Sequence, residues 1–148
     1  MSDQQTPPPF RVLPALDDEN RFFWTSGEDG RLRFLRCQDC STYIHPPLPE
    51  CPSCASHDLR PEAVSGLGEI FSYTVNHQPW DGDDKPYVIA LIALPEQDGL
   101  RLTSNIVGAS AAVDVDQIRI GRPVQVRFEH HGDVWLPVFE LLASGVGR

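Results

Sequence analysis

The sequence predicts a mainly β protein in which an N-terminal helix and a four-cysteine ribbon precede a five-stranded barrel. Three observations predict it: one short helix-capping segment with aromatic residues, two Cys-x-x-Cys pairs, and five later runs of β-branched and aromatic residues. At 148 residues, the chain can hold either one ordinary domain or one small domain together with a module that is stabilised by a metal. We expect a lead-in and aromatic helix at 1–29, a ribbon at 30–61 and the barrel at 62–148.

The N-terminal part is expected to be an extended lead-in over 1–16, followed by a helix that runs from Asp17 or Asp18 to about residue 26 and is ended by Gly27. Phe22, Phe23 and Trp24 are consecutive in this helix. Since successive helical residues are turned by about 100°, three aromatic side chains span too wide an arc for one narrow core contact. Either they cover the rest of the protein, or at least one faces outward toward another module or chain.

The composition limits the kinds of partner and compartment. The formal net charge is −9 and Lys85 is the single lysine, which argues against nucleic acid and anionic membranes as partners. The sequence has no basic and apolar signal segment and no stretch of the roughly 18 apolar residues that a membrane span needs. We therefore expect a cytoplasmic protein, in which reduced cysteines bind metal rather than form disulfides.

The ribbon is predicted by Cys37, Cys40, Cys51 and Cys54, two Cys-x-x-Cys pairs separated by ten residues. Two such turns can direct four thiolates onto one tetrahedral ion, and zinc is the usual occupant of such a site. Iron in a rubredoxin-like site is an alternative. A dithiol oxidoreductase would need one pair beside a βαβ pattern, which the sequence lacks. The predicted zinc is structural, because four sulfurs leave no position for a reactive water.

The residues around the cysteines complete the expected ribbon. The alternating segment 31–36 predicts a strand that leads into the first pair, and 55–61 is polar and turn-like. Ser41 and Ala55 follow the two pairs where glycine is frequent, and we expect both turns to tolerate them. His45 and His57 are expected at the surface rather than as ligands.

The barrel is predicted by five strand-like runs: 69–77, 87–94, 100–107, 124–128 and 134–141. Asp98-Gly99 predicts a hairpin turn between the second and third runs, and 111–118 a short helical turn. Pro137 suggests an edge or a bulge in the last strand. Five strands with a break after the third are typical of the OB fold, although another small barrel remains open.

The sequence offers few catalytic candidates. It contains no nucleophile elbow, P-loop, dinucleotide fingerprint or zinc-protease motif. His77, His130 and His131 are isolated histidines without a nearby nucleophile, so we expect them to be solvated.

The order of the motifs resembles the zinc-ribbon and OB-fold proteins associated with acyl-CoA enzymes. The likeness covers nearly the whole chain beyond residue 16 and is carried by the aromatic helix, Gly30-x-Leu32, the two cysteine pairs, Gly66-x-Gly68-x-Ile70, Pro86-Tyr87, Gly121-x-Pro123 and Leu136-Pro137. The resemblance implies a non-catalytic accessory subunit of a lipid-transfer-protein-type, thiolase-like enzyme. In steroid side-chain degradation, such a domain supports an aldolase that cleaves a steroid-CoA thioester by a retro-aldol reaction.

The resemblance also implies roles for particular residues. The aromatic helix with Phe22, Phe23 and Trp24 would dock on the partner together with the barrel, in a hetero-oligomer that helps to form the acyl-CoA channel. The local basic cluster of Arg31, Arg33 and Arg36 would meet CoA phosphates or acidic patches, although we favour solvated side chains on a strand. Two alternatives remain open: a stand-alone enzyme acting on acyl thioesters, and a nucleic-acid-binding ribbon-barrel protein.

Overall fold

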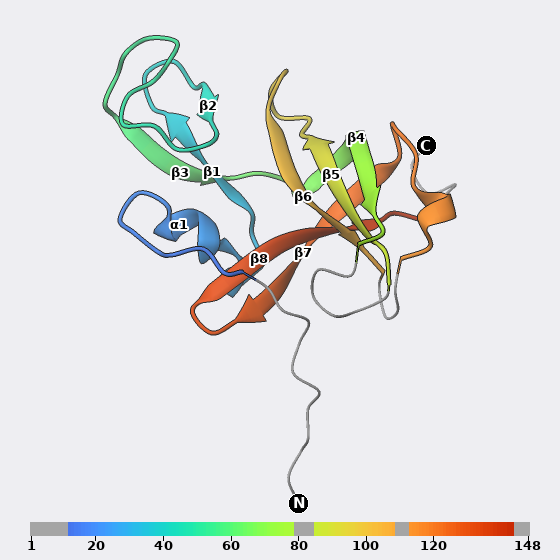
Figure 1. Ribbon diagram of the computed structural model, residues 1–148. Coiled ribbons are helices and arrows are strands. Elements are labelled where there is room, and N and C mark those ends of the chain that lie inside the picture. The colour runs from blue at the N-terminus through green and yellow to red at the C-terminus, as the bar shows by residue number, and fades with distance from the viewer. Residues whose placement is uncertain (1–11, 79–84, 109–112, 144–148) are drawn as a thin grey trace, which may run out of the picture.

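The computed structural model describes residues 12–78, 85–108 and 113–143 and contains two sheets (Figure 1). The first sheet has the strand order β2-β1-β3, and the second is a closed barrel of order β4-β5-β6-β8-β7. The helical elements are α1 (Arg21–Trp24), η1 (Ser26–Asp29) and η2 (Val115–Gln117), of which η1 and η2 are 3-10 helices. The strands are β1 (Arg33–Cys37), β2 (Tyr43–Ile44), β3 (Leu59–Ala63), β4 (Leu67–Asn76), β5 (Tyr87–Ala93), β6 (Arg101–Val107), β7 (Pro123–His131) and β8 (Val134–Leu141).

The N-terminal helix is shorter than predicted, because local side-chain hydrogen bonds replace its first turn. The Asp17 carboxylate accepts hydrogen bonds from the backbone amides of Glu19 and Asn20, which closes a turn and leaves α1 to begin at Arg21. Ser26 then donates its hydroxyl to the carbonyl of Phe22 at 2.9 Å, and the chain continues as the 3-10 helix η1.

Gly27 does not end the helix as predicted; Gly30, with φ 79°, ends η1. Gly27 instead allows close packing on the barrel. A Cβ at this position would lie 2.4 Å from Cγ of Phe128 in β7, a distance that no real contact allows. The β7–β8 hairpin therefore packs directly against η1 and α1, as Figure 1 shows at the lower end of the hairpin.

The ribbon sheet contains two strands that the sequence did not predict, the two-residue β2 and the longer β3. Residues 55–61 were expected to be turn-like, yet β3 begins at Leu59 and pairs antiparallel with the whole of β1. The signal was weak because β3 is mostly polar at the surface, where Arg36 of β1 pairs with Glu62 of β3 at 2.7 Å. The strand prediction for 31–36 is confirmed, since β1 spans Arg33–Cys37.

The barrel confirms the predicted OB fold and its five strands. Four neighbouring pairs are antiparallel, and β6 closes the barrel against β8 in parallel, with Ile106 opposite Phe139. β4 carries a register shift between Ile70 and Ser72. Pro137 is buried in β8 in register with Phe128 of β7, and its carbonyl accepts a hydrogen bond from the Ser104 hydroxyl of β6 at 2.7 Å, so it does not lie at the predicted edge or bulge.

One buried cluster joins the three predicted parts of the chain. Phe23 of α1 and Phe34 of β1 belong to the same core as Ile92 and Phe139 of the barrel, and all four are at most 4% exposed. The limits 1–29, 30–61 and 62–148 therefore stay predictions of where the parts begin and end. In the described part of the chain, no helix is long and apolar enough to span a membrane.

Candidate metal centre and partner-binding residues

The four cysteines come together at the end of the ribbon, as their spacing predicted. Cys37 ends β1, Cys40 follows in the next turn, and Cys51 and Cys54 belong to a second turn between β2 and β3. Their four sulfur atoms all lie within 4.8 Å of one another. A tetrahedral ion with metal–sulfur distances of about 2.3 Å would place its sulfurs about 3.8 Å apart, so the arrangement fits one ion.

The two turns repeat the same backbone geometry. The amide of Ser41 donates to the carbonyl of Cys37 at 2.9 Å, and that of Ala55 donates to Cys51 at 2.8 Å. Ser41 has φ 68° and Ala55 has φ 63°, both in the left-handed region. This conformation explains why glycine is frequent at these positions, and a side chain there costs about 1 kcal/mol or more. Both turns nevertheless form, as expected from the sequence.

The electrostatic environment of the four thiols favours a bound cation. The hydroxyl of Thr42, 3.1 Å from the Cys40 sulfur, lowers the pKa of Cys40 to about 6. The backbone amide of Ser56 lowers the pKa of Cys54, but hydrogen bonds among the sulfurs and burial outweigh it and raise this pKa to about 12. Neighbouring thiols therefore share protons when no cation is bound, whereas a divalent ion would allow all four to ionise.

An apolar shell and internal ion pairs surround this centre. Cys37 and Cys51 are buried with Ile44, and Leu35 and Leu59 pack against them. The arginines near the ribbon are also engaged: Arg36 pairs with Glu62, and Arg33 donates to Asp29 at 2.8 Å. That hydrogen bond lowers the pKa of Asp29 to about 2. The predicted basic cluster is therefore largely neutralised within the chain.

The two histidines near the ribbon differ in their surroundings. His57 is exposed beside Glu50, as expected. His45 is half-buried rather than fully at the surface: its ring lies 5.1 Å from that of Phe23 and 4.9 Å from that of Phe34, between centroids. Burial there lowers the pKa of His45. The sequence did not predict this packing because it did not reveal that α1 folds over this part of β1.

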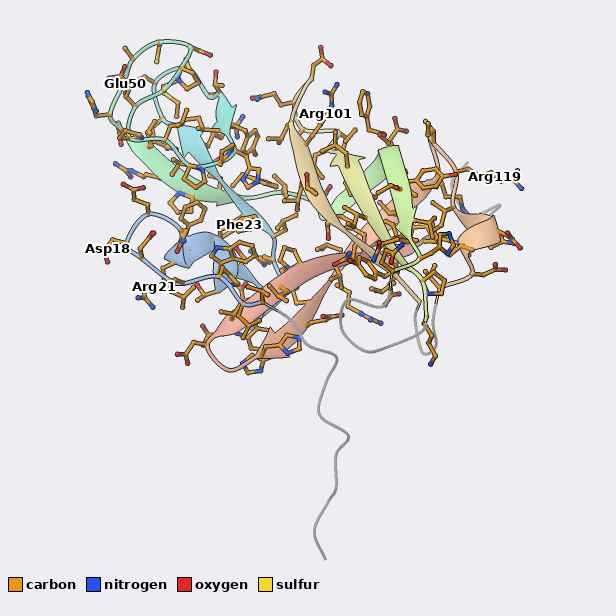
Figure 2. The ribbon with its side chains drawn as sticks, viewed as in Figure 1. Asp18, Arg21, Phe23, Glu50, Arg101 and Arg119 are labelled. Atoms are coloured by element: carbon orange, nitrogen blue, oxygen red, sulfur yellow. The ribbon has the colours of Figure 1, made fainter. Side chains whose placement is uncertain are left out.

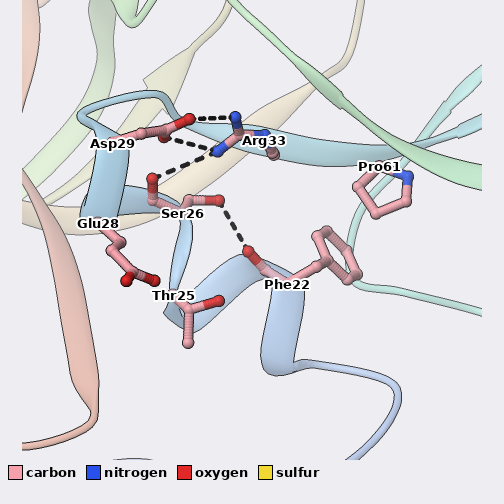
Figure 3. Close-up of a pocket in the computed structure, with 7 residues that line it drawn as sticks. All are labelled: Phe22, Thr25, Ser26, Glu28, Asp29, Arg33 and Pro61. Carbon is pink, nitrogen blue, oxygen red and sulfur yellow. Dashed lines mark hydrogen bonds and ion pairs between the residues drawn. The ribbon is translucent and has the colours of Figure 1, made fainter.

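The aromatic segment divides between core and surface. Phe23 is 4% exposed, whereas Phe22 and Trp24 are partly buried and pack against the same core from its edge. Figure 2 labels Phe23 beside β1, with Asp18 and Arg21 on the outer side of this segment. Phe22 also contributes to an open groove of about 390 Å³, shown in Figure 3, that is lined by Phe22, Thr25, Ser26, Glu28, Asp29, Arg33 and Pro61.

A side-chain clamp that the sequence did not indicate fixes the ribbon on the barrel. Gln97, in the turn between β5 and β6, accepts a hydrogen bond from the Tyr43 amide at 2.7 Å and donates to the Tyr43 carbonyl at 3.0 Å. Next to it, Glu96 accepts the amide of Ser65 at 2.8 Å. A glutamine in a turn carries no recognisable signal, because its partner lies 54 residues away in the sequence.

The isolated histidines form no catalytic constellation among the described residues. His77 is exposed. His130 stacks on Trp135 with ring centroids 3.7 Å apart, and His131 lies 3.4 Å from Glu129. No Ser, Thr or Cys nucleophile is within hydrogen-bonding distance of these rings in the part of the chain that the structure describes.

Comparison with known families matches two adjacent stretches of the chain. Residues 24–60 match the rubredoxin-like zinc ribbon domain of ChsH2, and residues 61–129 match the ChsH2 C-terminal OB-fold domain. Together the two matches contain the four cysteines and most of the barrel.

Similar proteins carry names of several acyl-CoA enzymes. The chain is 38% identical to the "Probable enoyl-CoA hydratase alpha subunit" of Thermomonospora curvata, over 92% of this chain and 41% of that protein. It is 33% identical to the 3-oxo-4,17-pregnadiene-20-carboxyl-CoA hydratase alpha subunit of Mycobacterium tuberculosis, over 82% and 37% of the two chains. It is 32% identical to the benzoylsuccinyl-CoA thiolase subunit BbsA of Thauera aromatica, over 60% and 62%. The chain thus spans about two fifths of the two alpha subunits.

A solved structure extends the likeness to the whole fold. A chain of the Ltp2-ChsH2(DUF35) aldolase superposes with a TM-score of 0.74 and 36% identity, and the match covers 87% of this chain and 98% of that one. The ribbon, the barrel and the sequence thus agree, and the chain belongs to the ChsH2/DUF35 family of zinc-ribbon and OB-fold proteins.

Proposed function

We propose that this chain is a non-catalytic accessory subunit that binds and stabilises a thiolase-like acyl-CoA enzyme. The observation that carries the proposal is that its relatives are named as parts of a hydratase, a thiolase and an aldolase. These enzymes run different reactions, so a ribbon and barrel common to all of them would supply something other than the bond-breaking chemistry. The hydratase and the thiolase are both named for CoA substrates, so the shared contribution that we propose is assembly with an acyl-CoA enzyme.

The chemistry of the described residues supports a non-catalytic role for this chain. The four-sulfur site is closed and offers no coordination position to a substrate. The histidines stack or form hydrogen bonds at the surface, and none lies beside a Ser, Thr or Cys nucleophile among the described residues. The hydratase activity in the names of the alpha subunits would then belong to other parts of those longer proteins.

The ion held by Cys37, Cys40, Cys51 and Cys54 would be structural zinc. Four thiolates suit zinc or iron, and the zinc ribbon domain that matches residues 24–60 favours zinc. Its contribution would be folding free energy, because the small apolar cluster beneath the sulfurs cannot hold the turns together alone. Elemental analysis of the purified chain should give one zinc per chain.

The aromatic segment would form part of the contact with the partner. Phe22 and Trp24 are partly exposed at the edge of the core, whereas Phe23 is buried inside it. Docking there would bring the partner to the junction of ribbon and barrel, and the chain would help to form its acyl-CoA channel. A steroid-CoA thioester is our specific candidate for the substrate, and retro-aldol cleavage is our candidate for the partner's reaction.

The test is to co-express the tagged chain with a candidate thiolase-like acyl-CoA enzyme from the same genome. We expect the two proteins to co-purify, acyl-CoA turnover to require the enzyme, and the KM for acyl-CoA to rise when the accessory chain is omitted. Trp24→Ala should weaken assembly more than it lowers the melting temperature, whereas the control Phe23→Ala should mainly lower stability. Turnover of acyl-CoA by the purified chain alone would contradict the proposal.

A further inference from the structure

The outer face of the barrel carries an apolar stripe on β5. All seven residues of this strand, Tyr-Val-Ile-Ala-Leu-Ile-Ala, are apolar, although successive side chains of a strand point to opposite faces. Val88, Ala90 and Ile92 fill the barrel and are at most 1% exposed. Tyr87, Ile89, Leu91 and Ala93 therefore point outward, and we call these four residues the β5 stripe. A sheet with one solvated face normally alternates apolar and polar residues, so the stripe departs from the pattern.

The strands on either side of the β5 stripe present small neutral residues. Ser72 and Thr74 of β4, and Thr103 and Asn105 of β6, lie directly opposite Leu91 and Ile89. The charged residues of these cross-strand rows, Glu69 and Arg101, lie at one end, opposite Ala93. A surface without charges at its centre is unusual in a chain of net charge −9, and it is the composition of the core of a protein interface.

Arg101 and Phe71 form the end of this surface. The guanidinium of Arg101 lies 3.7 Å from the ring centroid of Phe71, so the side chain reaches from β6 to β4 across the end of the β5 stripe. Phe71 is 45% exposed and Ile89 36% exposed. Among the described residues, Arg101 forms no ion pair with a carboxylate. The surface thus combines an apolar centre with one cation that no carboxylate of the described residues neutralises.

We propose that the β5 stripe, Phe71 and Arg101 form the face on which the acyl-CoA enzyme docks, with a carboxylate of that enzyme beside Arg101. The inference rests on the proposed function and adds a contact surface and its chemistry. Charge complementarity is the reason for choosing this occupant: a partner that buries the apolar stripe also removes water from Arg101, which then requires an acidic group. The docking face shares no residue with the aromatic segment, so the two would contact the enzyme at different places around the junction of ribbon and barrel.

The test measures the affinity of the co-purified thiolase-like enzyme for variants of the full chain by surface plasmon resonance. Ile89→Glu places a charge at the centre of the stripe and should weaken binding at least about 30-fold. Leu48→Glu is the matched control, because Leu48 is 45% exposed and lies in the ribbon after β2, outside the docking face. Arg101→Gln should weaken binding about 5- to 10-fold and reduce its dependence on salt. Arg119→Gln is its control, since Arg119 lies beside η2 and away from Arg101 in Figure 2.

The outcomes separate this inference from the proposed function. Loss of binding with Ile89→Glu and Arg101→Gln, while both controls bind normally, would support the docking face. Equal binding by all four variants would overturn the face and leave the accessory function standing. Failure of the unmodified chain to bind the enzyme would overturn the accessory function and the face with it. Self-association of the isolated chain that Ile89→Glu abolishes would assign the face to a second copy and overturn the proposed occupant.

Discussion

The clamp between Gln97 and Tyr43 gives the sharpest prediction about how the ribbon is held. Gln97→Met keeps the length of the side chain but removes both of its hydrogen bonds, which measure 2.7 and 3.0 Å. Tyr43 is 8% exposed and lies in the two-residue strand β2 at the edge of the ribbon sheet. The substitution therefore leaves a mostly buried amide and carbonyl without their protein partner.

The magnitude follows from these two hydrogen bonds. Each contributes about 1 kcal/mol net, and a buried group left unpaired costs about 1–3 kcal/mol. With some rescue by water, we expect Gln97→Met to lower the free energy of unfolding by about 3 kcal/mol. For a chain of this length, that loss corresponds to a decrease of about 6–12 °C in the melting temperature.

The assay is urea denaturation of the metal-loaded chain, with the rate of metal release to a chelator as a second readout. Gln125→Met is the control, because Gln125 is exposed on β7. Gln97→Glu should be destabilised at neutral pH, since a carboxylate cannot donate to the Tyr43 carbonyl, and should recover in acid when it is protonated. A stability of Gln97→Met within about 0.5 kcal/mol of the control would refute the clamp.

Three further predictions concern the metal, the backbone and the half-buried histidine. Chelation of the ion should make all four thiols reactive and lower the melting temperature strongly, since a structural zinc contributes about 10 kcal/mol or more; an unchanged melting curve would contradict a structural role. Ala55→Gly should stabilise the chain by about 0.5–1 kcal/mol in urea denaturation, because φ 63° suits glycine, whereas Ala63→Gly in β3 should destabilise it. Burial lowers the pKa of His45 below its ordinary value of 6.5, so the unfolded chain binds this proton at higher pH than the folded chain. The free energy of unfolding should therefore fall as the pH drops below about 6.5. His45→Phe should flatten that part of the pH–stability profile. If the variant keeps the slope of the unmodified chain, another group is responsible.

The shared core links these effects to partner binding. The rings of Phe23, His45 and Phe34 contact one another in tilted and T-shaped arrangements, and Phe22 and Trp24 pack against the same core, so a change in the ribbon reaches the aromatic segment through direct contacts. Loss of metal would then weaken assembly as well as folding. The two effects can be separated by comparing binding with melting temperature in the same variants.

The sequence alone determined those features that depend on neighbours close in the chain. Two Cys-x-x-Cys turns bring their sulfurs together through local backbone geometry, and runs of β-branched and aromatic residues predicted the five barrel strands, including Val134–Leu141 without an error at either end. Such patterns can be recognised in a sequence because the geometry of a turn and the alternation of side chains along a strand involve only a few neighbouring residues.

Only the tertiary structure decided the features that join distant segments. It paired polar β3 with β1, packed His45 against Phe23, and clamped Tyr43 with Gln97. It also showed which apolar residues of β5 remain at the surface. Both faces of this strand carry apolar side chains, but only one face points into the barrel. The physical reason is the same in each case: burial and pairing depend on which surfaces meet, and segments far apart in the sequence supply those surfaces.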